Sequence, residues 1–407
     1  MAAPTSHYLR RDTAEILRSA AYQYPAITLT GPRQAGKTTL LKHFFQREYR
    51  YIAVDRPEVR QAILSDPRGF FQSYPPPVIF DEVQAAPELM PYVREHVDQH
   101  RSEPAQFILL GSNNILLSKR VAETLAGRTA ILRLFPFTQR ELDGEPGRPL
   151  PWDRVEPGTH VEASPLDWAR LLRGFYPQVA RDELLDPALW FASYLSTFAE
   201  RDVRTFREVS DLTQFQMFMQ ALALRSGQLL NYSDVARDLG VAVNTVKAWL
   251  YVLEACYLVM IIRPWFRNKG KRLVKMPKVY FLDVGLMLHL CGVDQLTALR
   301  LGPMAGPAME TLVISEVFKT MSHRGLTPRL TFWRTSTGRE VDLIIETRGR
   351  IIPVEIKASA TSWPKMAENI EVFQADYPEA EKGWVVYSGN EVLPAGKHAT
   401  AWPVTAL

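Results

Sequence analysis

The stretch Gly31-Pro-Arg-Gln-Ala-Gly-Lys-Thr38 decides the fold of the N-terminal part of this chain. It matches a phosphate-binding loop: glycine, four residues, glycine, lysine, then threonine or serine. The apolar residues 26–30 before it are typical of a strand, and residues 39–45 after it are typical of the start of a helix. A glycine turn before an ordinary helix is the competing interpretation. The register of strand, loop and helix favours the phosphate loop.

The loop also predicts which residues hold a nucleotide. Its two glycines let backbone N–H groups turn inward around phosphate oxygens. We expect Lys37 to reach the β- and γ-phosphates and the Thr38 hydroxyl to bind Mg²⁺. The predicted nucleotide contacts are Gly31, Pro32, Arg33, Gln34, Ala35, Gly36, Lys37, Thr38 and Thr39.

A second apolar strand, residues 78–80, ends in two carboxylates. Asp81 is predicted to hold Mg²⁺ through water, and Glu82 is predicted to polarise the attacking water. The next strand runs into Ser112 and Asn113, either of which can sense the γ-phosphate. We assign this role to Asn113, although turn chemistry at a strand end explains the same residues.

Arg128 lies between the fourth and fifth predicted strands. An arginine in that place can stabilise transition-state charge in a neighbouring subunit, and a plain surface arginine is the alternative. The chain has no Asn-Lys-x-Asp motif for guanine recognition. ATP is therefore expected rather than GTP.

The composition indicates a folded protein of several domains. Its 407 residues suggest about two to four domains, and 46% are hydrophobic. The net charge is only +4, so nucleic-acid binding has to be argued from local patches. Cys256 and Cys291 lie in apolar stretches and indicate a reducing compartment. Without a signal-peptide core, and with no apolar run longer than residues 255–262, we expect a cytoplasmic protein that does not enter a membrane.

The middle of the chain is predicted to be helical. Residues 143–165 resemble a linker, and residues 166–226 a helical lid. A short capped helix (231–240) and a longer amphipathic helix (241–256) form a helix-turn-helix pattern. If this pair binds DNA, the second helix would contact it through Asn244, Thr245 and Lys247. A packing or partner-binding module is the alternative.

A basic run follows at residues 263–278. Seven of these sixteen positions are Lys or Arg and none is acidic, and Trp265 and Phe266 interleave. The pattern favours a wing that contacts phosphates, with aromatic stacking, over a solvated hairpin. The candidate phosphate contacts are Arg267, Lys269, Lys271 and Arg272.

A second candidate site lies near the C-terminus. Residues 340–345 and 351–357 alternate like two strands of a hairpin around the turn 347–350. Pairing them would bring Asp342 near Glu355 and Lys357, which share one sheet face. This spacing resembles the PD-(D/E)xK nuclease core, whose carboxylates bind Mg²⁺ and whose lysine orients water or stabilises charge.

A helix over residues 307–321 can supply a third carboxylate. Glu310 and Glu316 lie about 120° apart around a helix of 3.6 residues per turn, so only one can face the site well. We favour Glu310, near the helix start. An internal ion network without catalysis is the competing interpretation of the whole cluster.

Taken together, the motifs resemble a family of bacterial and archaeal ATPases. These join an AAA-type ATP-binding domain to a C-terminal domain of unknown function, DUF4143. The resemblance implies a five-stranded core in the order 5-1-4-3-2 and assembly into a ring or near-ring, for which a homo-hexamer is favoured. It also implies that Arg128 acts in trans. The matching stretches are residues 31–40, 80–84, 110–112, 125–128, 136–142, 200–203, 277–286 and 333–342.

We therefore predict an α/β protein: a P-loop AAA-type ATPase core, a helical lid, a winged-helix-like module and a C-terminal restriction-endonuclease-like α/β domain. The expected function is ATP hydrolysis with Mg²⁺, coupled to remodelling or processing of DNA. A regulatory ATP switch that binds DNA or a protein without cleavage is the alternative, and an RNA substrate stays open. The expected domain boundaries are 1–150, 151–226, 227–278 and 279–407.

Overall fold

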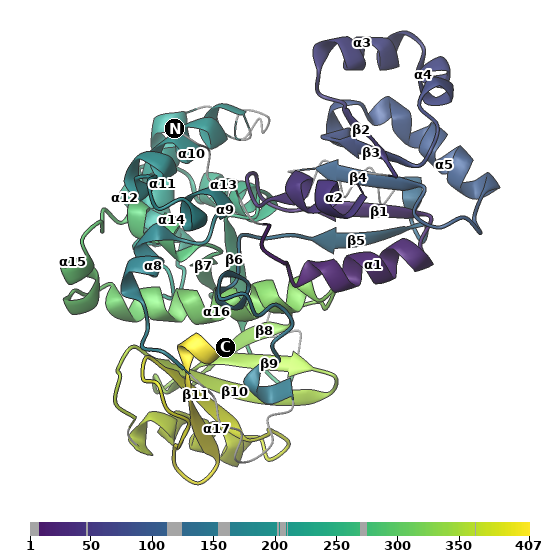
Figure 1. Ribbon diagram of the computed structural model, residues 1–407. Helices are drawn as coiled ribbons and strands as arrows, with labels where there is room; N and C mark the ends of the chain where they lie inside the picture. Colours follow the sequence, from purple (N-terminus) through teal and green to yellow (C-terminus); the bar gives the residue numbers. More distant parts are fainter. Residues whose placement is uncertain are drawn as a thin grey trace. The chain divides into compact units, whose positions relative to one another are not determined.

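In the computed structural model, the chain folds into two compact units (Figure 1). The first comprises residues 1–137, 255–257 and 322–326, and the second comprises the remainder. Among the helices described, none is both long and apolar enough to cross a membrane. The structure describes residues 8–45, 48–111, 124–153, 163–201, 203, 209, 211–268, 275–362 and 364–407.

The first unit is built on a parallel five-stranded sheet in the order β2-β3-β4-β1-β5, which confirms the order expected from the resemblance. Every residue of β1 is buried, because β1 lies between β4 and β5 and both faces of the sheet are covered. The strands are β1 (Ala26–Thr30), β2 (Arg50–Ala53), β3 (Val78–Asp81), β4 (Phe107–Gly111) and β5 (Thr129–Arg133).

Helices cover both faces of this sheet (Figure 1). Ile27 and Leu29 of β1 pack in one cluster with residues of α1 and α2, whereas Phe107 and Leu109 of β4 pack in another with residues of α3, α4 and α5. The alternation of side chains along each strand thus builds two cores. The helices are α1 (Thr13–Gln23), α2 (Lys37–Phe45), α3 (Pro57–Ser65), α4 (Pro67–Ser73) and α5 (Met90–Gln99).

Gly31, directly after β1, approaches the chain that leaves β5. A Cβ atom at Gly31 would lie 1.9 Å from the Leu134 carbonyl oxygen, and its φ is +147°. Both the space and the backbone conformation therefore require glycine. By contrast, Gly127 has φ +73° with nothing within 4 Å of its missing Cβ.

The second unit combines helices with an eight-stranded sheet. Its helical part includes α7 (Gln139–Leu142), α8 (Trp168–Arg173), α9 (Pro177–Arg181), α10 (Pro187–Arg201), α11 (Leu212–Ala223), α12 (Tyr232–Leu239), most of α13 (Val243–Ala255), α14 (Val284–Leu290), α15 (Leu296–Leu301), most of α16 (Ala305–His323) and α17 (Glu368–Asp376).

The sheet of this unit has the order β12-β13-β11-β10-β9-β8-β6-β7. Its strands are β6 (Val259–Pro264), β7 (Lys278–Phe281), β8 (Leu330–Arg334), β9 (Glu340–Thr347), β10 (Arg350–Lys357), β11 (Gly383–Tyr387), β12 (Leu393–Pro394) and β13 (Ala399–Pro403).

Both edges of the sheet have features that limit further strand pairing. The edge strand β12 is only two residues long and contains Pro394, which has no N–H to donate. At the other edge, residues before α12 cover β7: Leu229 forms a bridge to Lys278, and the Gly227 N–H donates to the Val279 carbonyl at 3.0 Å.

The predicted helix pair is present in the second unit. The Asn231 side chain caps α12 by accepting from the Ser233 N–H, and α12 ends at Gly240 in a left-handed conformation. Trp249 of α13 packs edge-on against Phe215 of α11.

The strands that follow the helix pair do not form a separate wing. β6 pairs with β7 and also, in parallel, with β8, so this hairpin belongs to the C-terminal sheet. The expected boundary between 227–278 and 279–407 falls inside β7. Trp265 is 2% exposed and packs on Phe373 and Tyr377, so its predicted stacking on bases is wrong. The physical reason is that the apolar faces of β6 and β7 require burial, which the larger sheet provides.

A fully buried ion pair lies within α16. Lys319 Nζ is 2.6 Å from Glu316 Oε1, and both side chains are 0% exposed. The other carboxylate oxygen, Glu316 Oε2, accepts from the Gln139 N–H at 2.7 Å, and the Lys319 ammonium lies 4.6 Å from the centre of the Phe175 ring. Glu316 therefore stabilises helix packing.

Replacing Gly31 with alanine is expected to destabilise the first unit. Overpacking against Leu134 together with an unfavourable φ should cost about 2–5 kcal/mol. The matched control, Gly127→Ala, meets only the unfavourable φ and should cost about 1 kcal/mol. Denaturant unfolding followed by tryptophan fluorescence and circular dichroism measures both, and equal effects would contradict the close approach.

Replacing the buried Lys319 is also expected to lower the free energy of unfolding. Lys319→Met leaves the Glu316 carboxylate buried without its cation and should cost about 3–5 kcal/mol, and adding Glu316→Gln should restore part of this loss. The exposed Lys365→Met in the same unit serves as control. If Lys319→Met unfolds at the same denaturant concentration as wild type, the pair contributes no stability.

Candidate functional sites

The phosphate loop, residues 31–36, joins β1 to α2. Positive φ angles at Gly31 (147°), Gln34 (61°) and Gly36 (91°) curl its backbone. Because α2 begins at Lys37, the free N–H groups of its first turn lie at the loop. Such a backbone forms an anion-binding cradle.

Lys37 lies over this cradle. Its ammonium donates to the carbonyl oxygens of Gly31 and Pro32 at 2.9 and 2.8 Å, and the side chain is buried. Phosphate oxygens can exchange for these carbonyls as partners. Gln34 and Thr39, also predicted contacts, are exposed beside the loop.

Asp81, at the end of β3, is held next to the loop by two hydroxyl groups. Thr38 Oγ1 donates to Asp81 Oδ2 at 3.2 Å, and the Tyr51 hydroxyl donates to the same oxygen. Burial and the Asp81 carboxylate raise the pKa of Tyr51, so its hydroxyl keeps its proton and donates. Tyr51 was not predicted from the sequence.

Glu82 follows with a left-handed backbone, φ 53°. Its Oε2 accepts from the Gln84 side-chain amide at 2.5 Å, and its Oε1 lies 3.7 Å from Arg33 Nη1. Because a left-handed glutamate is strained, the surrounding contacts hold it in this place. Gln84 is thus a positioning group that sequence reasoning missed.

A second missed residue, Arg11, supports the loop from behind. Its guanidinium is buried and donates to the carbonyls of Ala35 and Phe135 at 3.0 and 2.6 Å. It also lies 4.5 Å from the centre of the Phe137 ring. Arg11 therefore ties the phosphate loop to the chain after β5.

Arg128 forms an ion pair with Asp98 of the same unit. Its Nε and Nη2 donate to the two carboxylate oxygens of Asp98 at 2.6 and 3.2 Å. Hydrogen bonds from Arg128 and Arg101 lower the pKa of Asp98 to about 2. A role in trans would require Arg128 to leave Asp98, and that role stays a prediction. The alternatives Ser112 and Asn113 lie outside the described residues.

The C-terminal candidate site lies on the antiparallel hairpin β9–β10. Its register pairs Leu343 with Val354 and Thr347 with Arg350, as the predicted turn requires. The Ile356 N–H donates to Asp342 Oδ2 at 2.8 Å, which fixes this carboxylate beside β10.

Glu355 and Lys357 lie on the same face of β10. Lys357 Nζ is 2.6 Å from Glu355 Oε1. Glu355 is 3% exposed, and its Oε2 has no hydrogen-bond partner among the described residues. Burial raises the pKa of Asp342 well above its usual range, and the Glu355 and Glu310 carboxylates raise it further. A cation would be stabilised strongly beside these carboxylates.

The structure places Glu310 with this cluster and Glu316 in the separate pair with Lys319. Glu310 Oε1 accepts from Lys278 Nζ at 3.0 Å and from the Tyr280 hydroxyl at 2.5 Å. Lys278 also contacts Glu340 Oε1 at 2.5 Å. Burial lowers the pKa of Lys278, but the surrounding carboxylates outweigh burial and raise it. Sequence reasoning missed both Lys278 and Tyr280 as parts of the site.

The predicted nucleic-acid contacts lie apart from these two sites in the chain. Asn244 and Lys247 are exposed on α13, and Thr245 is half-buried. Arg267 is exposed and pairs with Glu379 at 3.2 Å. Lys269, Lys271 and Arg272 lie outside the described residues.

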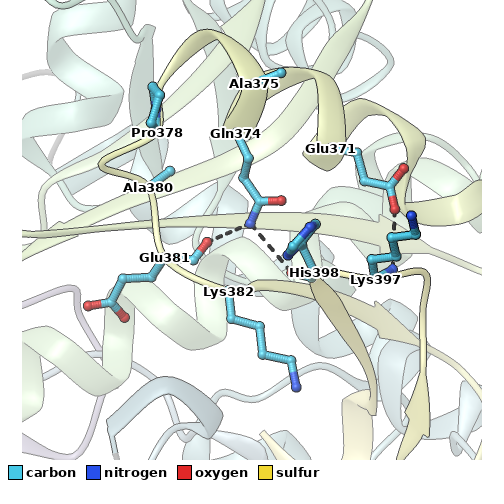
Figure 2. A pocket seen from close by; sticks show the side chains of 9 residues that line it. All are labelled: Glu371, Gln374, Ala375, Pro378, Ala380, Glu381, Lys382, Lys397 and His398. Atoms are coloured by element: carbon cyan, nitrogen blue, oxygen red, sulfur yellow. Dashed lines mark hydrogen bonds between the residues drawn. The ribbon is translucent and has the colours of Figure 1, made fainter.

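An open hollow of about 620 Å³ lies beside α17. Figure 2 shows Gln374 between its walls, donating to the backbone carbonyls of Glu381 and His398 at 2.7 and 3.4 Å. Lys382 and Lys397 balance the carboxylates of its lining. No residue of either candidate site lines this hollow.

Comparisons with known proteins place the chain among its relatives. Three family models match: an AAA domain at residues 23–143, the domain of unknown function DUF8612 at 168–297, and the domain of unknown function DUF4143 at 305–407. The uncharacterized proteins Mb2031c of Mycobacterium bovis and Rv2008c of Mycobacterium tuberculosis are each 31% identical over 98% of this chain and 84% of their own length.

Two solved structures show a weaker likeness. The Walker-type ATPase PABY2304 of Pyrococcus abyssi is 15% identical, with a TM-score of 0.41, over 70% of this chain and 97% of its own. A variant of RuvB from Thermotoga maritima is also 15% identical, with a TM-score of 0.29, over 64% of this chain and 91% of its own. The 31% identity to the mycobacterial proteins over 98% of this chain, with the AAA and DUF4143 models matching at residues 23–143 and 305–407, shows that this chain belongs to the family of AAA-type ATPases with a C-terminal DUF4143 domain.

Proposed function

We propose that this ATPase acts on DNA and couples ATP turnover to remodelling or processing by a metal-dependent, nuclease-like site. The observation that carries the proposal is the convergence of Asp342, Glu355 and Lys357, in which one buried Glu355 oxygen has no hydrogen-bond partner among the residues that the structure describes. The phosphate loop of the same chain supplies the site for ATP.

In the nucleotide site, the residues have separable tasks. Lys37 exchanges its loop carbonyls for phosphate oxygens, and Glu82, held by Gln84, accepts a proton from the attacking water. Thr38 and Asp81 offer the oxygen ligands that Mg²⁺ prefers, and the ion would neutralise phosphate charge.

In the C-terminal site, Asp342 and Glu355 offer carboxylate oxygens that would hold a divalent cation, which would polarise a phosphodiester. Lys357 is placed to orient a water molecule or to stabilise charge on the phosphate. This arrangement supports hydrolysis of a nucleic-acid backbone.

The helix α13 supports DNA as the substrate. Asn244 and Lys247 are exposed at its N-terminal end, where a recognition helix contacts bases. Tyr251, 55% exposed, continues the same face one turn later. We also propose a homo-oligomer, most simply a hexamer, in which Arg128 exchanges Asp98 for a neighbour's nucleotide.

A regulatory ATP switch is the second candidate. It is favoured by Lys278, whose ammonium pairs with two carboxylates of the C-terminal cluster and compensates part of their charge. In that case the C-terminal domain binds a DNA or protein partner and does not cut.

ATP turnover should depend on Lys37 and Glu82 in different ways. Lys37→Ala should lose both ATP affinity and turnover, whereas Glu82→Gln should keep ATP binding and lose turnover by about 10²–10⁴-fold. The nearby exposed Glu88→Gln should behave like wild type. Phosphate release and binding of a fluorescent ATP analogue measure the two properties. An unchanged rate in Lys37→Ala would refute the ATPase half of the proposal.

The nuclease assay separates the two candidate functions. With Mg²⁺ or Mn²⁺, wild type should cleave duplex, single-stranded or branched DNA, and Asp342→Ala should abolish cleavage because a carboxylate beside Glu355 is lost. The exposed Asp376→Ala in the same domain should retain it. Cleavage that survives Asp342→Ala, or no cleavage of any substrate, would leave the switch as the better description.

A further inference from the structure

Lys278 is the second lysine of the C-terminal carboxylate cluster, after Lys357. Lys278 Nζ bridges Glu310 Oε1 at 3.0 Å and Glu340 Oε1 at 2.5 Å, and its side chain is 4% exposed. The Phe332 ring lies 5.4 Å from the same ammonium. A buried cation shared by two carboxylates does what a bound metal ion does: it compensates their charge.

Glu310 is held from several sides. Its Oε1 already accepts from both Lys278 and Tyr280. A Cβ atom placed at Gly227 would lie 3.1 Å from Glu310 Oε2, so the glycine backbone runs near this oxygen. Through its Oε1 atom, Glu310 is therefore already engaged by Lys278 and Tyr280.

Asp342 and Glu355 differ from Glu310 in this respect. Asp342 accepts one backbone N–H, and Glu355 keeps a buried oxygen with no partner among the described residues. A cation ligated by these two residues would satisfy that oxygen.

The charge of the cluster also indicates one divalent cation. With every group ionised, as a bound cation would favour, the four carboxylates of Asp342, Glu355, Glu310 and Glu340 stand against the two ammonium groups of Lys278 and Lys357. Arg334, 42% exposed, pairs with Glu340 at the rim. The net charge of these ionised groups is −2, or −1 with Arg334 included. One divalent ion brings the cluster close to neutrality, and a second would leave a buried positive excess.

We propose that Lys278 is a built-in cation that takes the place of a second metal ion, so that Glu310 is not a metal ligand and the cluster binds a single divalent cation through Asp342 and Glu355. This rests on the metal-dependent site proposed above. Glu310, which the sequence predicts to be a metal ligand, would instead be the ion-pair partner of Lys278.

Binding of Mn²⁺ to the full-length, nucleotide-free chain tests the proposal. All variants carry Asp81→Asn, which removes the other candidate metal site, and titration calorimetry with electron paramagnetic resonance counts bound ions. The starting protein should bind one Mn²⁺, and Asp342→Asn should abolish it. Glu310→Gln should leave the affinity within about threefold, because Glu310 is not a ligand.

The lysine variant gives the complementary readout. Lys278→Met should gain a second Mn²⁺, or bind the first about tenfold or more tightly, because Glu310 and Glu340 become free to ligate. Glu310→Gln in that background should remove the gain. Lys365→Met, exposed and outside the cluster, should bind like the starting protein.

Several outcomes would overturn the proposal. They are two Mn²⁺ ions in the starting protein, an affinity loss of about tenfold or more in Glu310→Gln, or a folded Lys278→Met with unchanged binding. If Lys278→Met does not fold, Glu310→Gln alone decides. If the starting protein binds no Mn²⁺, the metal site of the proposed function fails, and a Glu310-dependent gain in Lys278→Met still supports the lysine's role, whereas no gain refutes it.

Discussion

The close approach of Gly31 to the Leu134 carbonyl is the constraint on which the first unit depends. It brings the chain after the central strand β1 against the chain after its neighbour β5, with no space for a side chain. Arg11 joins the same two segments from behind through Ala35 and Phe135. The conformation of the loop is thus fixed by contacts with the chain that follows β5.

The second unit contains several charged side chains that are buried. Glu316 with Lys319 is a closed pair that supports packing. The cluster around Asp342 is not closed, because the Glu355 carboxylate retains an oxygen without a partner among the residues described. Buried charge that is fully compensated stabilises a fold at best weakly, whereas buried charge left incomplete is the usual mark of a binding site.

Local patterns predicted the elements on which both candidate sites lie. The loop before α2, the carboxylates at the end of β3 and the β9–β10 hairpin each depend on neighbouring residues, and the strand order followed from the resemblance. Contacts between segments far apart in the sequence could not be predicted from local patterns. Tyr51 reaches Asp81 from β2, and Lys278 reaches Glu310 across 31 intervening residues. The residues around Trp265 do not distinguish a buried tryptophan from an exposed one. The pairing of β6 with β8 places this side chain in the interior.

The edges of the eight-stranded sheet bear on how copies of this chain can meet. A strand of two residues that includes Pro394 offers almost no row of backbone donors to a neighbour, and β7 has its edge partly covered by residues 227–230. Growth of this sheet by adding a strand from another molecule is therefore limited at both edges. We expect assembly involving this domain to use side-chain surfaces, which can separate and re-form without disturbing the backbone ladder of the sheet.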